Sequence, residues 1–576
     1  MESPLFAQPC RLLSLPDELK LHILNYLDTR RDLYNVSRTC HVLEDVTMAR
    51  LYHSIDLDLP LGRVSKEPGT SILRAPVTQS IRELTVRSGP LSRRRSVYSR
   101  RRKSDAGSIE VHVNGILDKI PMKRLKSFAI LHQTPLSQQT LDLVVRRNEH
   151  TLQHLGFYEA APWQESTLLP LNLTSLECRA VNEGDGVENV ISANRSTLQK
   201  LYLGQEKHLV DQYRRTRLGF LEQIPRPAET FFTSAFALDK YSHLRELSLS
   251  GLDVTLLRPT TTSQAVLFCK LERLSLESCP GTTELLDSIA GTFHWTSYSP
   301  EAPQNPPIVP SLKHFLLRHE NPNTALKDAV IRFLSSFTGL RTLSLLFENA
   351  AVLERPSTLI AEHGPTLHTL VLESRIQPRE HLSLDTSRPF GVGGYSSELW
   401  EESINDIARL CPNLVELGMG FPWNDELVRL HKTALPTLQH LKTIHIRNFP
   451  ENQVFSQLGD YSIKEYATKF IEWAFPALVG GGRPTLEQLA IGPTLYESRW
   501  KMSPASNTTT STSTNTSTST RRQVPEFLRT HHFCLDWAKT RFGRWSPLIT
   551  PVSEKYMEEL AGEKPLRGVF EQVWLR

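Results

Sequence analysis

Long apolar runs are absent from this chain of 576 residues. No segment approaches the ~18 consecutive apolar residues that a membrane-spanning helix needs. The first ten residues lack a basic stretch followed by an apolar one, which argues against a secretory signal. We therefore expect a protein of the cytoplasm, the nucleus or both.

An excess of charge of one sign is also absent. The chain has 66 basic and 62 acidic residues, a formal net charge of +4. Such a balance argues against the strongly basic field that is typical of nucleic-acid and membrane-surface binders. With 39% hydrophobic and 22% charged residues, the composition is that of a globular protein. We expect neither nucleic acid nor membrane among its partners.

Cysteines are few, and their spacing suggests no pairs. There are seven, and an odd number leaves at least one thiol free, as is typical of a reducing compartment. The cluster His531-His532-x-Cys534 lacks two further ligands at suitable spacing. We predict no metal site.

Catalytic motifs are missing as well. The sequence contains no G-x-S-x-G elbow, no glycine-rich loop of the kind that binds phosphate and no H-E-x-x-H. Cys40 lies within a predicted helix and is interpreted as a small hydrophobic residue rather than a nucleophile. We therefore predict a protein that is not an enzyme, with no catalytic residue and no cofactor.

A dense helical pattern fills the first sixty residues. Residues 15–43 read LPDELKLHILNYLDTRRDLYNVSRTCHVL. Pro16 and Asp17 suit a first helical turn, because proline loses no hydrogen bond there and an acid favours the positive end of the helix dipole. Asp28-Thr29 predicts the N-cap of a second helix, and a third is expected over about 41–52.

The first predicted helix has two apolar faces. Leu19, Ile23 and Leu27 recur four residues apart on one face, and Leu21 and Leu24 lie on another. A module of roughly forty residues has too little interior to bury both faces. One face should close a small helical bundle, and the other should pack against a partner's helix.

This segment resembles the F-box signature, in the order Leu15-Pro16-x-Glu18-Leu19, Ile23-Leu24, Leu27-Asp28, Asp32-Leu33 and Val36. Residues 51–57 resemble the strand that often follows an F-box. The resemblance implies docking to the Skp-type adaptor of a cullin–RING ubiquitin ligase. The implied adaptor contacts are Leu15, Pro16, Leu19, Ile23, Leu24, Leu27, Leu33 and Val36. An ordinary amphipathic helix pair that packs on the rest of the chain is the alternative.

A six-residue template with apolar residues at positions one, four and six recurs beyond this module, as in Leu244-Arg-Glu-Leu247-Ser-Leu249. The copies begin at Ile81, Leu125, Leu152, Leu173, Leu198, Leu244, Leu271, Leu312, Leu340, Leu367, Leu414, Leu441 and Leu486. About half a dozen such matches would arise by chance. The starts, however, lie mostly about 27 or about 45 residues apart, and the shorter spacing falls within the leucine-rich-repeat period.

Helical apolar spacing occurs between copies, at residues 325–335, 398–410 and 462–475. From about residue 75 to 495 the chain resembles leucine-rich-repeat proteins. The resemblance implies an α/β solenoid, with parallel strands on the concave face and helices on the convex face.

The alternation of a strand predicts that template positions three, five and seven face outward. Across the copies these positions hold six acids and six bases, with tyrosines and histidines among them. Such a mixed surface is typical of a protein partner, although a solvated strand face without a ligand is also possible. The candidate target-binding residues are Tyr158, Arg179, Lys200, Tyr202, Arg273, Arg318, His445 and Arg447.

These patterns predict an F-box module at residues 1–60, a repeat array at 61–500, a Ser/Thr-rich linker at 503–520 and an aromatic cap at 521–576. The cap could instead form part of the target site. Residues 92–108 are predicted to be a disordered basic loop. Ser96 and Ser104 there follow an Arg-Arg-x-Ser pattern, so the loop could be a phosphorylation site, a nuclear localisation patch or a solvated charge cluster.

The function predicted is that of a substrate-recognition subunit of a ubiquitin ligase. The N-terminal module would bind the Skp-type adaptor, and through it cullin and RING subunits, while the repeats bind an unknown target protein. The alternative is a scaffold or protein-interaction module that does not act in a ligase.

Overall fold

The computed structural model describes residues 12–27, 30–58, 75–87, 102–131, 135–163, 169–181, 186–205, 241–259, 262–298, 309–320, 322–348, 355–375, 397–421, 430–447, 462–476, 483–492, 530–541 and 544–553. Within these ranges no helix is both long enough and apolar enough to cross a membrane. The fold is mixed α/β, with an N-terminal helical region followed by parallel strands. The chain divides into two compact units, and the boundary falls at strand β7 (Glu246–Ser250).

The first unit begins with three short helices. They are α1 (Asp17–Leu24), α2 (Arg30–Ser37) and α3 (His41–Leu51), and β1 (Ser54–Asp58) follows them. Pro16 occupies the N-cap of α1, and Asp17 and Glu18 lie in its first turn. The three predicted helices and the strand after them are confirmed. The predicted cap at 28–29 lies outside the described residues.

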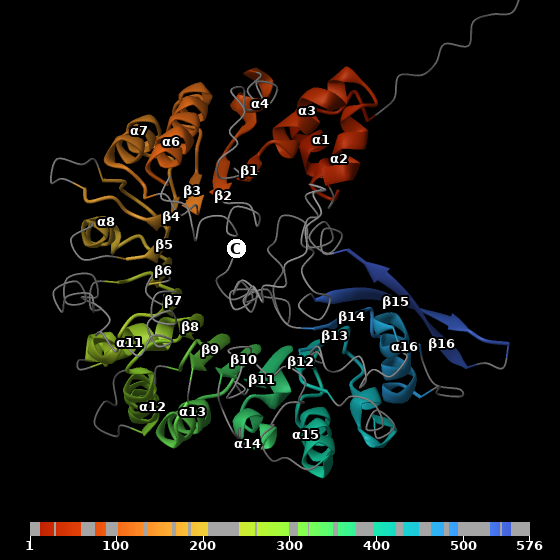
Figure 1. Cartoon of the computed structure of the whole chain (residues 1–576). Helices are drawn as coiled ribbons and strands as arrows, with labels where there is room; N and C mark the ends of the chain where they lie inside the picture. The colour runs from red at the N-terminus through yellow and green to blue at the C-terminus, as the bar shows by residue number, and fades with distance from the viewer. Residues whose placement is uncertain are drawn as a thin grey trace, which may run out of the picture. The chain divides into compact units, whose positions relative to one another are not determined.

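The rest of the first unit alternates strands and helices, with helices on one side of the strands (Figure 1). Its elements are α4 (Ala75–Ser80), β2 (Glu83–Arg87), α6 (Arg102–Lys119), β3 (Ser127–Leu131), α7 (Gln138–Asn148), β4 (His154–Glu159), β5 (Ser175–Ala180), α8 (Val187–Asn194) and β6 (Lys200–Gly204). From β1 to β6 the strands pair in parallel in chain order.

The second unit follows the same plan from β8 onward. Its strands are β8 (Arg273–Glu277), β9 (His314–Glu320), β10 (Thr342–Glu348), β11 (Thr369–Arg375), β12 (Glu416–Met419), β13 (Thr443–Ile446) and β14 (Gln488–Ile491). The helices are η2 (Thr255–Leu257), α11 (Thr262–Lys270), α12 (Thr282–Tyr298), α13 (Thr324–Ser335), α14 (Pro356–Ile360), η3 (Gly364–Thr366), α15 (Ser397–Leu410), η5 (Leu435–Thr437) and α16 (Ile463–Ala474). Parallel pairing runs in chain order from β8 to β14.

Every copy of the six-residue template forms a strand. Strands β2 to β14 all begin at the third template position, two residues after the apolar residue that opens the copy. Each opening side chain is at most 3% exposed. Within each unit, paired strands align third position with third position, for example Thr342 with Thr369. The three helices predicted between copies are confirmed as α13, α15 and α16.

A set of buried side chains joins successive copies. The Asn194 side-chain oxygen accepts the backbone N–H of Leu173 at 2.8 Å, and its amide donates to the carbonyls of Pro170 and Val190. Asn148 makes the equivalent bond to the N–H of Leu125 at 3.0 Å. Each asparagine lies four residues before its own template and bonds the opening residue of the preceding copy.

A threonine directly before a copy of the template makes a second recurring bond between successive copies. Thr151, Thr197, Thr366 and Thr485 each donate a hydroxyl hydrogen bond to the carbonyl of the residue that opens the preceding copy, at 2.7–3.1 Å. These bonds satisfy main-chain groups that stacking would otherwise bury unpaired.

An antiparallel hairpin follows β14, formed by β15 (His531–Lys539) and β16 (Trp545–Val552). The template did not predict it. Trp537 lies against the last copy, since its indole N–H donates to the Leu486 carbonyl at 2.9 Å and its ring meets Phe475 edge to face. Phe533 and Trp537 are buried, whereas Phe527, Phe542, Phe570 and Trp574 lie outside the described residues.

Part of the expected basic loop is helical. Residues 102–108, which were predicted within the loop, form the start of α6. A helix whose apolar positions begin at Ile109 extends by one hydrogen bond per added residue, so polar residues before it can join it. Ser104 lies in this helix. Residues 92–101, including Ser96, and the linker at 503–520 lie outside the described residues.

Candidate functional site

The N-terminal helices close around a small core of their own. Leu24, Leu33 and Val46, one from each helix, are 4–6% exposed. The partly buried side chains packed against them are Leu21, Leu27, Val36 and Leu51. One apolar face of α1 therefore closes the bundle, as the sequence predicted.

The other face of α1 is exposed. Leu19 is 50% exposed and Ile23 43% exposed. Tyr26, which follows the helix, is 74% exposed, and its ring meets that of His22 edge to face. Leu19 and Ile23 are one helical turn apart and so share a face of α1, and Tyr26 lies in the turn directly after the helix. Large apolar side chains this exposed on so small a module suggest a surface that another molecule covers.

The predicted adaptor contacts fall into three groups. Pro16, Leu19 and Ile23 are exposed, and Leu15, Leu27 and Val36 are half-buried. Leu24 and Leu33 are buried in the core of the bundle, so their side chains are not presented to a partner as the sequence-based assignment required. The exposed and the buried members of this set both recur at helical spacing in the sequence. Only the packing of the three helices shows which of them the bundle covers.

Other exposed apolar residues of the module were missed. Leu12, Tyr26, Tyr34 and Val42 are 37–74% exposed. Tyr26 could have been found, because it continues the spacing of Leu19 and Ile23. Tyr34 lies on α2 beside Arg38, whose guanidinium is 5.8 Å from the ring centroid. We define the docking surface as Leu19, Ile23 and Tyr26.

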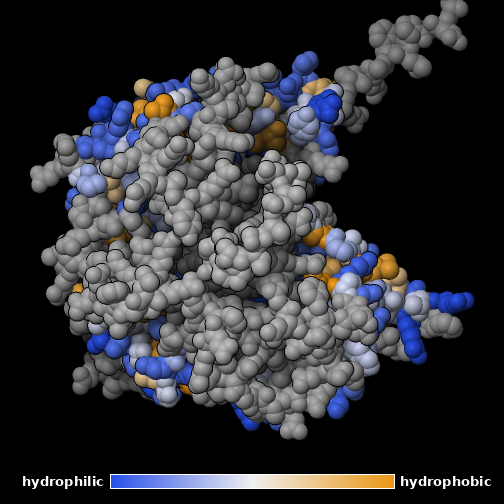
Figure 2. Space-filling view, in the orientation of Figure 1, coloured by the Kyte–Doolittle hydropathy of each residue, from blue (hydrophilic) through white to orange (hydrophobic). Residues whose placement is uncertain are grey.

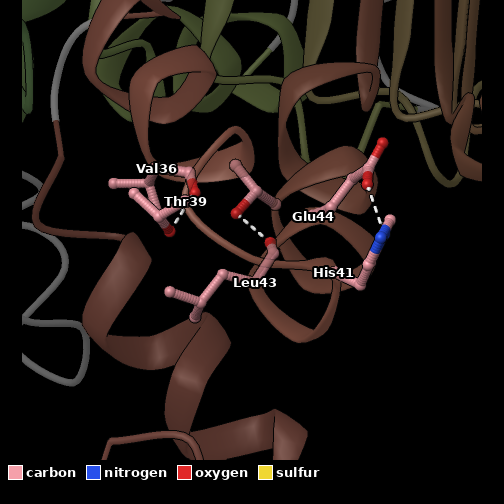
Figure 3. Close-up of polar contacts among 6 residues, drawn as sticks. Val36, Thr39, His41, Leu43 and Glu44 are labelled. Carbon is pink, nitrogen blue, oxygen red and sulfur yellow. Dashed lines mark hydrogen bonds and ion pairs between the residues drawn. The ribbon is translucent and has the colours of Figure 1, made fainter.

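Polar contacts fix the entry into α3 (Figure 3). The Thr39 hydroxyl donates to the Val36 carbonyl at 2.7 Å and so closes the end of α2. His41 and Glu44 approach within 3.2 Å in the first turn of α3. The Thr47 hydroxyl donates to the Leu43 carbonyl inside the helix. The connection between α2 and α3 is therefore defined by local bonds rather than by the bundle core alone.

The strand face, the second candidate surface, is largely neutralised by ion pairs. Arg179 pairs with Glu177 at 2.7 Å, Arg318 with Glu277 at 3.3 Å and Arg87 with Asp56 at 3.1 Å. Arg273 lies 3.9 Å from Glu246, and Arg447 pairs with Glu373. Five of the six bases predicted to face outward are thus paired with acids of the same strand or of another strand in the same unit.

One of these pairs reaches across an intervening strand. Arg447 follows β13 and Glu373 belongs to β11, with β12 between them. Gly418 on β12 provides the room, because a Cβ atom there would lie 3.3 Å from the Arg447 Cδ atom. His445 is buried beside this pair, and its Nε2 hydrogen-bonds the Gly492 carbonyl at 2.8 Å.

The predicted target-binding residues are mostly inaccessible. Arg179, Tyr202, Arg318, His445 and Arg447 are at most 7% exposed. Tyr158 and Arg273 are half-buried, and Lys200 is exposed. The sequence gives the direction of each side chain but not the partner that covers it.

The described cysteines form no disulfide with one another, and most are buried. Cys178, Cys269, Cys279 and Cys411 are at most 1% exposed. Burial raises the pKa of the Cys269 thiol to about 11 and that of Cys411 to about 12, so these two remain protonated near neutral pH. His532 and Cys534 lie on β15, and among the described residues no three His, Cys, Asp or Glu side chains gather as metal ligands would.

Comparison with known families supports the N-terminal assignment. Residues 12–58 match the family model described as F-box-like, and this span covers α1, α2, α3 and β1. The match supports an F-box protein, and F-box domains generally bind Skp-type adaptors. No curated protein matches the chain.

Proposed function

We propose that this chain is the substrate-recognition subunit of an SCF-type cullin–RING ubiquitin ligase, acting in the cytoplasm, the nucleus or both. Its F-box-like domain binds a Skp-type adaptor through the docking surface. The parallel strands and their helices form a leucine-rich-repeat solenoid that binds a target protein. Parallel strands that begin at one template position, at leucine-rich-repeat spacing, support the solenoid.

The contribution of such a protein is proximity. The F-box-like domain tethers the chain to the ligase, and the repeats hold the target nearby. Other subunits then transfer ubiquitin to a target whose effective concentration is high. This mechanism requires no catalytic residue or cofactor in the chain itself.

The observation that carries the proposal is the exposure of Leu19 and Ile23 beside a bundle core that is already complete. These side chains contribute little to folding of the bundle, because the core forms from Leu24, Leu33 and Val46. An amphipathic groove or helix on a partner would bury them.

The target surface should act through shape and local hydrogen bonds more than through charge. Because the strand-face arginines pair with acids, this face offers no uncompensated row of guanidinium groups. Of the predicted contacts, we retain Tyr158, Lys200 and Arg273, which are at least partly accessible.

The first test is capture of a purified Skp-type adaptor by the full chain. Leu19→Asp with Ile23→Asp should weaken binding by about 100-fold or more, since each side chain contributes ~1.5 kcal/mol or more when buried. Val111→Asp is the matched control, because Val111 is 70% exposed on α6, outside the F-box-like domain. Equal capture of both variants and the wild type would disprove the docking mechanism.

A scaffold that binds the adaptor without delivering targets would pass that test. The two functions differ in their effect on a bound client. A ligase subunit recruits cullin with the adaptor, and the client's half-life lengthens when Leu19 and Ile23 are both replaced. A scaffold leaves the client's half-life unchanged.

A further inference from the structure

Among the described residues, the hairpin of β15 and β16 comes last in the order of paired strands, and β16 is therefore an edge strand. Such a strand presents main-chain N–H and C=O groups to any other chain that can pair with it. Leu548 is 54% exposed on this strand. Figure 2 shows hydrophobic patches among hydrophilic side chains over the hairpin. An edge of this composition is a template for association unless something blocks it.

The register shows which main-chain groups of β16 face outward. Thr540 donates its N–H to the Arg544 carbonyl at 2.7 Å, and these two residues extend the register in which Lys539 lies opposite Trp545. Bonded and non-bonded pairs alternate along an antiparallel ladder. Residues 546, 548, 550 and 552 therefore bond β15, whereas 545, 547, 549 and 551 turn their main-chain polar groups away from it.

Two of these four outward positions are prolines. Pro547 lies opposite Trp537 and Pro551 opposite Phe533. Proline has no N–H, so neither position can donate a hydrogen bond to an incoming strand. The pairing of β16 with β15 loses no hydrogen bond, because positions 547 and 551 do not bond β15. Each proline thus removes a donor only from the open side.

On the other side of the hairpin, β15 extends beyond its pairing with β14, and different groups occupy its edge there. The last bond from β15 to β14 is from Leu535 N–H to the Glu487 carbonyl at 2.8 Å. Beyond it, the next N–H on that side belongs to Trp537, and the Asp536 carboxylate accepts it at 2.8 Å. Asp536 also pairs with Arg483 at 2.8 Å, which holds the carboxylate in place. Lys539 then places a charge at the end of the strand.

We propose that Pro547 and Pro551 block strand addition at the outer edge of β16, so that this hairpin ends the sheet and keeps copies of the chain from pairing edge to edge. The occupant excluded is a β-strand, above all β16 of a second copy. The hairpin is then more than a cover for the last repeat, because it also stops main-chain hydrogen bonding beyond that repeat.

The test is P547T/P551T in the full chain, which restores both outward N–H groups with a strand-favouring residue. Sedimentation velocity should show this variant shifting to larger species as concentration rises, relative to the wild type. The matched control is S546T/L548T, which places threonine where the N–H already bonds β15, and it should sediment as the wild type does. A P547T/P551T variant that keeps the wild-type distribution, with the hairpin intact, overturns the proposal.

Amide hydrogen exchange of the wild type tests the register independently of any variant. The amides of Leu548 and Thr550 should exchange at least tenfold more slowly than that of Ile549, since only the first two bond β15. In the associated variant, the new amides at 547 and 551 should become protected. Equal exchange at positions 548, 549 and 550 in the wild type would show that the prolines do not face the open edge.

Discussion

His363 shows how burial in the second unit controls the ionisation of a single side chain. It is fully buried against the Phe337 ring, with centroids 4.8 Å apart, and its Nδ1 lies 3.5 Å from the Leu340 N–H. Burial lowers the pKa of His363 to about 4 from its usual 6.5. Its position, four residues before a template, is the one that Asn148 and Asn194 occupy in other copies.

This side chain should make stability depend on pH. The unfolded chain binds the proton more tightly, so the contribution of His363 to stability is complete above about pH 6.5 and declines as pH falls toward 4. A shift from 6.5 to about 4 corresponds to at most about 3 kcal/mol. His363→Asn keeps a hydrogen-bond acceptor without the titration. It should reduce the loss of unfolding free energy between pH 7 and pH 4.5, measured by urea denaturation.

The control for this prediction is His368→Asn. His368 is exposed and lies five residues from His363, directly before β11. Its replacement removes a surface histidine of the same segment, and the pH profile of His363→Asn is compared with that of this variant. If the two variants gave the same profile as the wild type, the depressed pKa would have no thermodynamic consequence.

At the level of single residues, the sequence predicted side-chain direction better than burial. Period-two alternation placed Arg318 and Glu277 on the same side of adjacent strands, and they do form an ion pair there. It could not show that the pair is buried. Leu24 was likewise listed among the adaptor contacts on the strength of the F-box resemblance, although its spacing places it on the other face of the helix from Leu19, and it is buried in the bundle core.

At the level of elements, the repeated asparagine and threonine bonds hold neighbouring copies in register. Asn194 is 0% exposed and makes three hydrogen bonds, each 2.8 Å long, to main-chain groups. Removing its amide leaves the Leu173 N–H buried without this acceptor. A buried donor that loses its partner is costly, because water cannot replace the bond.

Asn194→Ala should therefore lower the unfolding free energy of the chain by about 2–3 kcal/mol. The control is Asn189→Ala, because Asn189 is exposed on the same helix, α8. That change should alter stability by less than about 0.5 kcal/mol. Denaturant titration of both variants measures the difference. Equal stability of the two would mean that the asparagine bond does not tie the copies together.

The thirteen template strands could be predicted because one physical requirement recurs in each of them. Every copy needs a large apolar residue at position one to fill the layer between strand and helix, and this residue repeats at a visible spacing. The hairpin after β14 has no such template. Its two strands are antiparallel, and Phe533 and Trp537 lie opposite two prolines. This arrangement occurs once and does not repeat along the sequence, so no periodic pattern could predict it.

At the level of the whole molecule, the apolar docking surface and the charged strand face belong to different parts of the chain. The exposed apolar residues Leu19, Ile23 and Tyr26 lie in the F-box-like domain at residues 12–58. The strand face of the repeats instead carries charges that pair with one another, within strand β5 in the first unit and between strands in the second. A change confined to the docking surface should therefore leave the repeats folded and able to bind.

That separation predicts the outcome of affinity purification with mass spectrometry. The full chain with Leu19→Asp and Ile23→Asp should lose the Skp-type adaptor, cullin and RING subunits together. Proteins bound by the repeats should be retained, and should increase if the ligase normally degrades them. Val111→Asp should recover the same set as the wild type. Were the double variant to lose all partners equally, the two surfaces would not be independent, and recognition of the target would depend on the N-terminal helices as well.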